Sequence, residues 1–175
     1  EMPANVVDRL LMATDEETRQ KINALLNYPE DSAGSIMNID YISLNKEMTV
    51  ADAILKIRQV GINKETIYTC YVTERRKLIG TVSAKELMTE DDSMVIESLM
   101  ETEIISVKTH TDKEEVARLF TKYDLIALPV LDEDDHMVGI VTFDDAMDVM
   151  VEEATEDITK MAAINPSEKP YFATS

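Results

Sequence analysis

An internal repeat constrains this chain more than any other feature. Residues 35–44 return as residues 98–107, and residues 77–83 return as residues 136–142. A period of about 60 residues that occurs only twice is typical of two paired small domains and not of a solenoid. Lobes of this size bury little surface alone, so we expect them to pack against each other and leave clefts between them. That arrangement favours binding and regulation over catalysis.

Apolar residues recur with the same pattern in both copies of the repeat. The pattern predicts the order strand, helix, strand, strand, helix in each copy. In the first copy these elements are expected at residues 42–44, 50–60, 68–73, 78–82 and from 84 onward. In the second copy they are expected at residues 104–107, 113–123, 128–131, 137–142 and from 143 onward. A mixed order with hairpins indicates an α/β or α+β fold of two lobes.

Helical segments flank the two copies. Residues 1–34 predict two short helices, at 6–12 and 14–26, which are too few for a separate domain. A long helix is expected from 143 to 163, with an apolar stripe on one side and acids on the other. The stripe consists of Met147, Met150, Val151, Ala154, Ile158 and Met161. The acids are Asp144, Asp145, Asp148, Glu152, Glu153, Glu156 and Asp157. Because like charges four residues apart repel, this face is either a solvated surface or a site for something positive.

The charge balance limits the partners of the chain. It has 17 basic and 35 acidic side chains, a net charge of −18. This argues against binding of nucleic acid or anionic lipid, which needs clustered Lys and Arg. Either the charge serves solubility or cations relieve it. The single cysteine, Cys70, is expected in the core. The longest apolar run, 125–131, is too short to span a bilayer, so we expect a soluble chain. It does not begin with Met, and we expect it to be part of a longer protein.

Two seven-residue phrases carry a family resemblance. Residues 80–86 and 139–145 resemble the CBS-domain signature of a glycine, two apolar residues, a Ser or Thr, two further residues and an acid. Met37 and Met100 stand where that family often has a Met ahead of a short strand. The resemblance implies a tandem CBS domain pair whose cleft commonly binds an adenine nucleotide such as ATP. In that family the hydroxyl meets phosphate and the acid takes ribose hydroxyls.

The nucleotide contacts implied by this resemblance come from both copies. Those of the first copy are Tyr68, Ser83, Lys85 and Glu86, and those of the second are Pro129, Thr142 and Asp148. The second copy matches the signature fully, with Thr142 and Asp145. The first has Glu86 where the family has Asp, which leaves ATP binding open. For Tyr68, core packing remains an alternative to stacking on adenine.

The sequences outside the repeat resemble one CBS-containing family in particular. Residues 28–37 resemble the phrase between the N domain and the CBS pair of MgtE-type magnesium transporters. Residues 153–158 resemble the phrase that opens their connecting, or plug, helix. The resemblance divides the chain into a helical remnant of the N domain, CBS domain 1, CBS domain 2, and the start of the plug helix with a tail. The corresponding residues are 1–34, 35–96, 97–150 and 151–175.

The resemblance also implies a mechanism and a set of metal ligands. MgtE-type proteins are homodimeric Mg²⁺ channels of the cell membrane, and their cytoplasmic domains close the pore when Mg²⁺ binds between acidic surfaces. The homodimer would form through the CBS domains, which would act on the transmembrane domain of the same protein. Mg²⁺ takes oxygen ligands and keeps several waters, so one or two carboxylates on each of two surfaces suffice. The implied ligands are Asp31, Asp112, Glu114, Asp124, Asp145, Glu153, Glu156 and Asp157.

Two details of this assignment are open. Asp31 is expected opposite an acid of the second CBS domain, most simply Asp145, but Asp145 cannot easily serve both a metal and a ribose. The run Arg75-Arg76-Lys77 weakens any metal site in its own turn. His110 and His136 are expected in surface turns without partners for a metal site.

Other function classes have weaker support. The chain lacks the common hydrolase, P-loop and dinucleotide motifs, so we expect no enzyme activity. A Ca²⁺ buffer would need the glycine-centred loop of an EF-hand, which is absent. The serious alternative is a nucleotide-sensing CBS module of some other protein, which would bind adenine nucleotide tightly and respond little to Mg²⁺.

Overall fold

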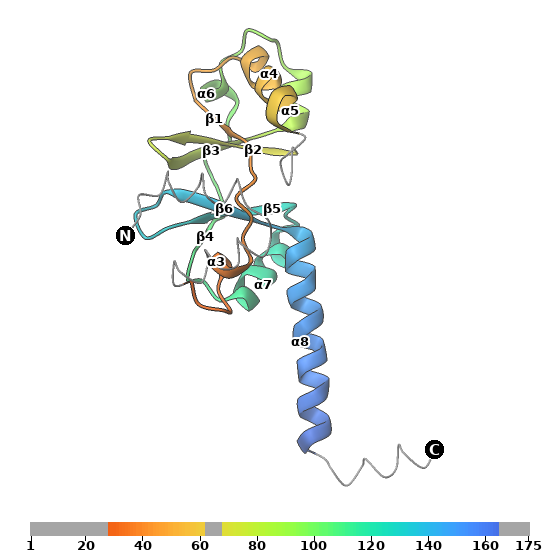
Figure 1. Cartoon of the computed structure of the whole chain (residues 1–175). Helices are drawn as coiled ribbons and strands as arrows, with labels where there is room; N and C mark the ends of the chain where they lie inside the picture. The colour runs from red at the N-terminus through yellow and green to blue at the C-terminus, as the bar shows by residue number, and fades with distance from the viewer. Residues whose placement is uncertain (1–27, 62–67, 165–175) are drawn as a thin grey trace.

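The two copies of the repeat fold as two similar lobes. The computed structural model describes residues 28–61 and 68–164, and Figure 1 shows the lobes stacked, each around a small sheet. The first lobe contains β1 (Ser43–Leu44), α4 (Val50–Val60), β2 (Thr69–Glu74), β3 (Lys77–Ser83) and α5 (Ala84–Thr89). The second contains β4 (Val107–Lys108), α7 (Lys113–Tyr123), β5 (Ala127–Leu131), β6 (Met137–Thr142) and α8 (Phe143–Ile164). Two short helices, α3 (Ala33–Ile36) and α6 (Ile96–Leu99), precede the respective first strands.

The predicted α/β fold class is confirmed, and most boundaries agree. Helices α4 and α7 and strand β6 have the predicted ends, and α8 ends one residue later than expected. The strand expected at 104–107 is wrong in its start, because only Val107 and Lys108 pair with β5. The prediction missed α3 and α6, since a four-residue helix carries no 3.6-residue period. The helices expected at 6–12 and 14–26 lie outside the described residues.

The sheets repeat the same register. In each lobe a two-residue strand pairs parallel with the middle strand, which pairs antiparallel with the third. The strand orders are β1-β2-β3 and β4-β5-β6. Even the irregularity in the antiparallel pair recurs, after Val72 in β2 and after Val130 in β5. The duplication therefore extends to local details of the backbone.

Each sheet has one face toward its own helices and one toward the other lobe. Because side chains alternate along a strand, Cys70 and Val72 of β2 enter the core of the first lobe while Tyr71 points to the opposite face. There Tyr71 packs with Met137 and Ile140 of β6 in a small core between the lobes. The prediction that Cys70 is a core residue is confirmed.

The cores are completed by exchanged segments. Met37, which precedes the first lobe in sequence, lies in the core of the second lobe, and Met100 packs against the core of the first. A Cβ on Gly139 would lie 2.7 Å from the Met37 sulfur, and one on Gly80 would lie 2.5 Å from the Met100 sulfur. The two signature glycines therefore leave space for a Met side chain from outside the lobe: Gly139 for Met37, and Gly80 for Met100. The boundary between CBS domain 1 and CBS domain 2 at residue 96 remains a prediction.

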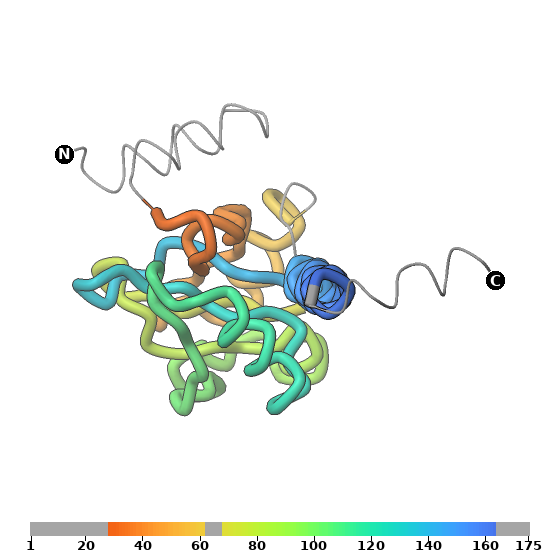
Figure 2. Tube along the Cα trace, turned by 90° about the horizontal axis from the view of Figure 1, so that it is seen from below, coloured from red at the N-terminus to blue at the C-terminus, as the bar shows by residue number. Residues whose placement is uncertain are grey.

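Helix α8 leaves the body of the protein. Its first turns pack against α7, and its second half projects away from both lobes (Figure 1). Seen along its own axis in Figure 2, α8 stands at one side of the molecule. Val151, Ile158 and Met161 of its apolar stripe are between 61% and 68% exposed. None of the helices that the structure describes is long and apolar enough to cross a membrane.

Candidate functional site

The signature phrases form the starts of two helices. The Ser83 hydroxyl accepts a hydrogen bond from the Glu86 amide at 3.1 Å, and a Glu86 carboxylate oxygen accepts from the Ser83 amide at 3.2 Å. This reciprocal pair is a capping box, which satisfies amides that a helix leaves unpaired at its start. In the second lobe the Thr142 hydroxyl donates to the Asp145 carboxylate at 3.1 Å. Helix capping thus explains the hydroxyl and the acid of both phrases without a ligand.

Asp145 is held partly buried by this arrangement. Burial raises the pKa of its carboxyl group, and the hydrogen bond from Thr142 opposes that rise. The negative charges of Asp148 and Asp144 raise the pKa further. A positive ion or a hydrogen-bond donor approaching Asp145 would therefore relieve an unfavourable charge.

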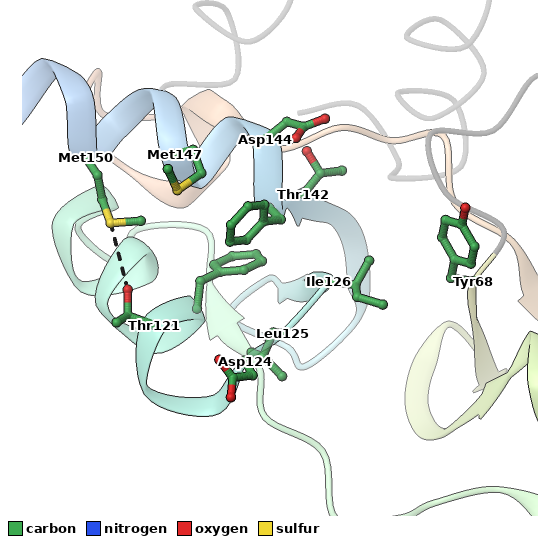
Figure 3. Close-up of a pocket in the computed structure, with 11 residues that line it drawn as sticks. Tyr68, Thr121, Asp124, Leu125, Ile126, Thr142, Asp144, Met147 and Met150 are labelled. Carbon is green, nitrogen blue, oxygen red and sulfur yellow. Dashed lines mark hydrogen bonds between the residues drawn. The ribbon is translucent and has the colours of Figure 1, made fainter.

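The larger cavity of the cleft, of about 640 Å³, lies between the lobes beside the start of α8. Tyr68 approaches it from the first lobe and is 65% exposed, and Thr142 and Asp144 lie on the opposite side (Figure 3). Asp124 reaches the cavity because it ends α7 in the left-handed conformation, with φ 52°. Further lining residues are Phe120, Thr121, Leu125, Ile126, Phe143, Met147 and Met150. Of the predicted nucleotide contacts, Tyr68 and Thr142 lie here.

A second cavity, of about 300 Å³, adjoins the first and shares Asp124, Leu125 and Ile126 with it. Pro129 and Tyr71 also line it, from the two facing sheets. The Tyr71 hydroxyl is buried without a hydrogen-bond partner in the described part of the chain. The remaining predicted nucleotide contacts line neither cavity; they are Ser83, Lys85, Glu86 and Asp148.

Two of the predicted metal ligands meet where α7 and α8 pack. Glu114 of the first turn of α7 faces Glu153 of α8, and its carboxyl group is the largest cause of a raised pKa at Glu153. That contact, together with desolvation and the negative charges of Glu114, Glu156 and Asp157, raises the pKa of Glu153 to about 7. The structure thus brings four of the eight predicted ligands to one stretch of α7 and α8.

Asp31 lies at the same interface but not opposite Asp145. Its carboxylate is 3.1 Å from the Lys113 ammonium, which is 3.4 Å from the carboxylate of Glu152. Asp145 instead bonds to Thr142 near the start of α8. The geometry favours Glu152 over Asp145 as the acid of the second lobe that faces Asp31.

The other predicted ligands are more dispersed. The Asp112 side chain caps α7 by accepting from the Glu114 amide at 2.8 Å. Asp124 lies in the cleft, at the opposite end of α7. Glu156 pairs with Lys160 at 3.2 Å on the exposed part of α8. Asp124 thus lies apart from Glu114 and Glu153, whereas Glu156 follows Glu153 by three residues on α8.

Sequence reasoning missed a group of possible ligands in the β5–β6 turn. Oxygen or nitrogen atoms of Asp132, Asp134 and His136 lie within 4.8 Å of one another. The expectation that His136 has no partners for a metal site is therefore wrong, whereas His110 is exposed as expected. The run Asp-x-Asp-x-His was a usable signal, because the Asp132 carboxylate accepts from the Asp134 and His136 amides and so folds the turn around itself.

Comparisons with known proteins agree with this fold. The family model described as "CBS domain" matches residues 33–92 and 96–152. The magnesium transporter MgtE of Thermus thermophilus is 40% identical over 164 residues, which are 93% of this chain and 36% of that protein. MgtE of Bacillus subtilis is 38% identical over 154 residues, 87% of this chain and 34% of that protein. The chain thus spans about a third of the length of these relatives.

Solved structures give the same result. A crystal structure of the cytosolic domain of the Mg²⁺ channel MgtE in complex with ATP is 40% identical, with a TM-score of 0.71 over 77% of this chain and 55% of that one. The soluble part of a magnesium transporter is 35% identical, with a TM-score of 0.72 over 86% of this chain and 64% of that one.

Proposed function

The chain belongs to the CBS-domain family and corresponds to the cytosolic region of MgtE magnesium transporters, and from this premise we propose that it senses Mg²⁺ for such a transporter. In this proposal it lies at the cytoplasmic face of the membrane, acts as a homodimer and controls a pore in a transmembrane domain. It is a regulatory module and not an enzyme.

The observation that carries the proposal is the carboxylate pair of Glu114 and Glu153. Two neighbouring carboxylates repel each other when both are ionised. Mg²⁺ is a hard cation with oxygen ligands, so one ion can offset this repulsion and bridge both carboxylates through direct or water-mediated contacts. Glu156 and Asp157 follow on the same helix and add negative charge to the site.

The position of the pair connects metal binding to conformation. Glu114 is in the first turn of α7, and Glu153 is near the middle of α8, whose second half projects from the lobes (Figure 1). Without a metal, repulsion loosens α8 from α7; with Mg²⁺, α8 is held. The free energy available for this change is the difference in Mg²⁺ affinity between the two arrangements. Asp31, Asp112, Asp124 and Asp145 are proposed to bind further ions at contacts with the N domain or the second subunit.

Titration calorimetry and small-angle scattering with Mg²⁺ test this function. We expect Mg²⁺ to bind, to make the protein more compact and to raise its Tm beyond a control of matched ionic strength. Glu153→Gln should weaken the response, whereas Glu90→Gln, at an exposed acid after α5, should leave it unchanged. Equal responses of the two variants would rule out the Glu114–Glu153 site, and no specific response of the unaltered protein would rule out Mg²⁺ sensing.

An adenine nucleotide in the cleft is a second candidate ligand. Two adjoining cavities, lined by Tyr68 and Thr142 in one and by Pro129 in the other, support it, as does the ATP bound to the 40% identical cytosolic domain. Ser83, Lys85, Glu86 and Asp148 remain proposed contacts. We expect ATP to bind in calorimetry and Tyr68→Ala to weaken it, with Tyr123→Ala as the control. Tight ATP binding with no Mg²⁺ response would favour a nucleotide sensor of another kind.

A further inference from the structure

Lys113 stands in an unusual electrostatic position. It is the first residue of α7, where the helix dipole disfavours a positive charge. Its side chain is only 20% exposed, although its partners Asp31 and Glu152 are 70% and 69% exposed. The hydrogen bond that Lys113 donates to Asp31 raises the pKa of Lys113 most; burial opposes this rise, and the hydrogen bond to Glu152 adds to it. The ammonium group is thus held by two carboxylates of other segments and not by its own helix.

The three partners come from separate parts of the fold. Asp31 precedes the first lobe. Backbone hydrogen bonds anchor its segment to the start of α7, and this anchoring does not depend on the Lys113 side chain. The bond from the Lys113 amide to the Asp31 carbonyl is 2.8 Å long, and that from the Ala33 amide to the Thr111 carbonyl is also 2.8 Å. Glu152, by contrast, is on α8. The contribution specific to the Lys113 side chain is therefore its hold on α8.

Two opposite interactions lie next to each other at this point. Lys113 attracts Glu152, while the following residue on each helix forms the repulsive pair of Glu114 and Glu153. The two contacts act on the same turn of α8 with opposite sign. The position of α8 without a metal depends on their balance.

We propose that Lys113 is a resident cation that holds α8 against α7 when no Mg²⁺ is bound, and so limits how far the carboxylate repulsion opens this interface. Lys113 is a positioning residue in this scheme, not a ligand. The inference rests on the proposed Mg²⁺ sensing in one respect only, namely that Mg²⁺ takes over the same role at Glu114 and Glu153.

Hydrogen exchange of the full chain tests the role of Lys113. Without Mg²⁺, Lys113→Met should speed exchange of amides 150–160 about two- to fivefold, the range that a partly exposed ion pair can give. Lys113→Arg should restore protection. Lys122→Met, at the other end of α7, is the matched control, because its ammonium lies over the Tyr123 ring and not against α8. Lys113→Met combined with Glu152→Gln should exchange no faster than Lys113→Met alone.

The outcomes separate this inference from the proposed function. If Lys113→Met and Lys122→Met exchange alike without metal, the role of Lys113 is overturned, even if Mg²⁺ still protects α8 in the unaltered protein. If Lys113→Met exchanges faster than Lys122→Met even at saturating Mg²⁺, the result supports the role of Lys113 and contradicts the bridging of Glu114 and Glu153 by Mg²⁺. If Mg²⁺ removes the difference, both stand.

Discussion

The two lobes share a backbone but differ in the charge of the same turn. Between its antiparallel strands the first lobe has Arg75-Arg76-Lys77, and the second has four acids at residues 132–135. The structure places these turns together: Lys77 forms a β-bridge with His136, and the Met137 amide donates to the Arg76 carbonyl at 2.8 Å. The same position of the repeat thus carries opposite charge in the two lobes, which makes the two turns electrically complementary.

The second difference is the last helix of each lobe. In the first lobe α5 ends after 6 residues, whereas α8 of the second continues for 22. Glu153 lies beyond the length that α5 and α8 have in common, so the Glu114–Glu153 pair of the proposed site has no counterpart in the first lobe. The shared part of the repeat positions Glu114, and the extension of α8 positions Glu153.

Substitution of the signature glycines should have the largest effect and tests how alike the cores are. Because a Cβ at Gly80 or Gly139 would overlap a Met of the exchanged segment, each Gly→Ala change should lower the free energy of unfolding by about 1–3 kcal/mol. Denaturant unfolding measures this. Met37→Ala should offset part of the cost of Gly139→Ala but none of that of Gly80→Ala. Equal effects of Met37→Ala on both would contradict the pairing.

The lobes also differ at the position of Tyr71, because the equivalent residue of β5 is Pro129. Removing the Tyr71 hydroxyl is expected to keep or raise the stability of the protein, whereas the glycine substitutions lower it. The buried hydroxyl has no hydrogen-bond partner among residues 28–61 and 68–164, so Tyr71→Phe should be neutral or should stabilise the protein by up to about 1 kcal/mol. Thermal unfolding gives the value, and Tyr123→Phe at an exposed site should change nothing. A clear loss of stability would indicate that the hydroxyl bonds to water or ligand in the cleft.

The pH dependence should belong to the second lobe alone. The folded pKa of Glu153, about 7, is above its ordinary value of 4.5, so the folded state binds more protons between those values. Without Mg²⁺, stability should therefore rise as pH falls from 8 toward 5, before general acid effects begin. Glu153→Gln should flatten this part of a Tm–pH curve, and saturating Mg²⁺ should do the same. An unchanged slope in Glu153→Gln would contradict the assignment.

The smallest expected effect concerns the two complementary turns. Lys77 lies near Asp135, whose pKa is lowered first by Lys108 and then also by Lys77. Lys77→Glu should slightly lower the Tm at low salt, and the loss should disappear at high salt because exposed charges are screened. Lys85→Glu, also exposed in the first lobe, serves as the control. A loss that persists at high salt would show that packing, and not charge, joins the turns.

Local patterns predicted the elements, and contacts between distant segments did not follow from them. The apolar periodicity of residues 50–60 and 113–123 predicted both ends of α4 and of α7, because each of these helices buries one regular face. The exchange of Met37 and Met100 could not be predicted, because the sequence does not show which lobe an adjoining segment completes. Lys113 was missed for the same reason, since its partners lie about 40 and 80 residues away.

The signature phrases show a different kind of limit. Ser83 and Glu86 have the spacing of a capping box, a local rule that was sufficient to predict their hydrogen bonds. They were interpreted as nucleotide contacts. In that case the same side chains would have to cap the helix and bind the nucleotide as well. The predicted metal ligands divide similarly: Glu114 and Glu153 face each other, while Asp31 pairs with Lys113.

The exchanged methionines also bear on how this protein unfolds and how it is inherited. Since Met37 completes the second lobe and Met100 the first, a cut between them at residue 96 would leave both lobes without part of their cores. We therefore expect the pair to melt in one cooperative step, with no stable half. The two lobes should therefore be transferred between proteins only together, because neither lobe alone encodes its complete core.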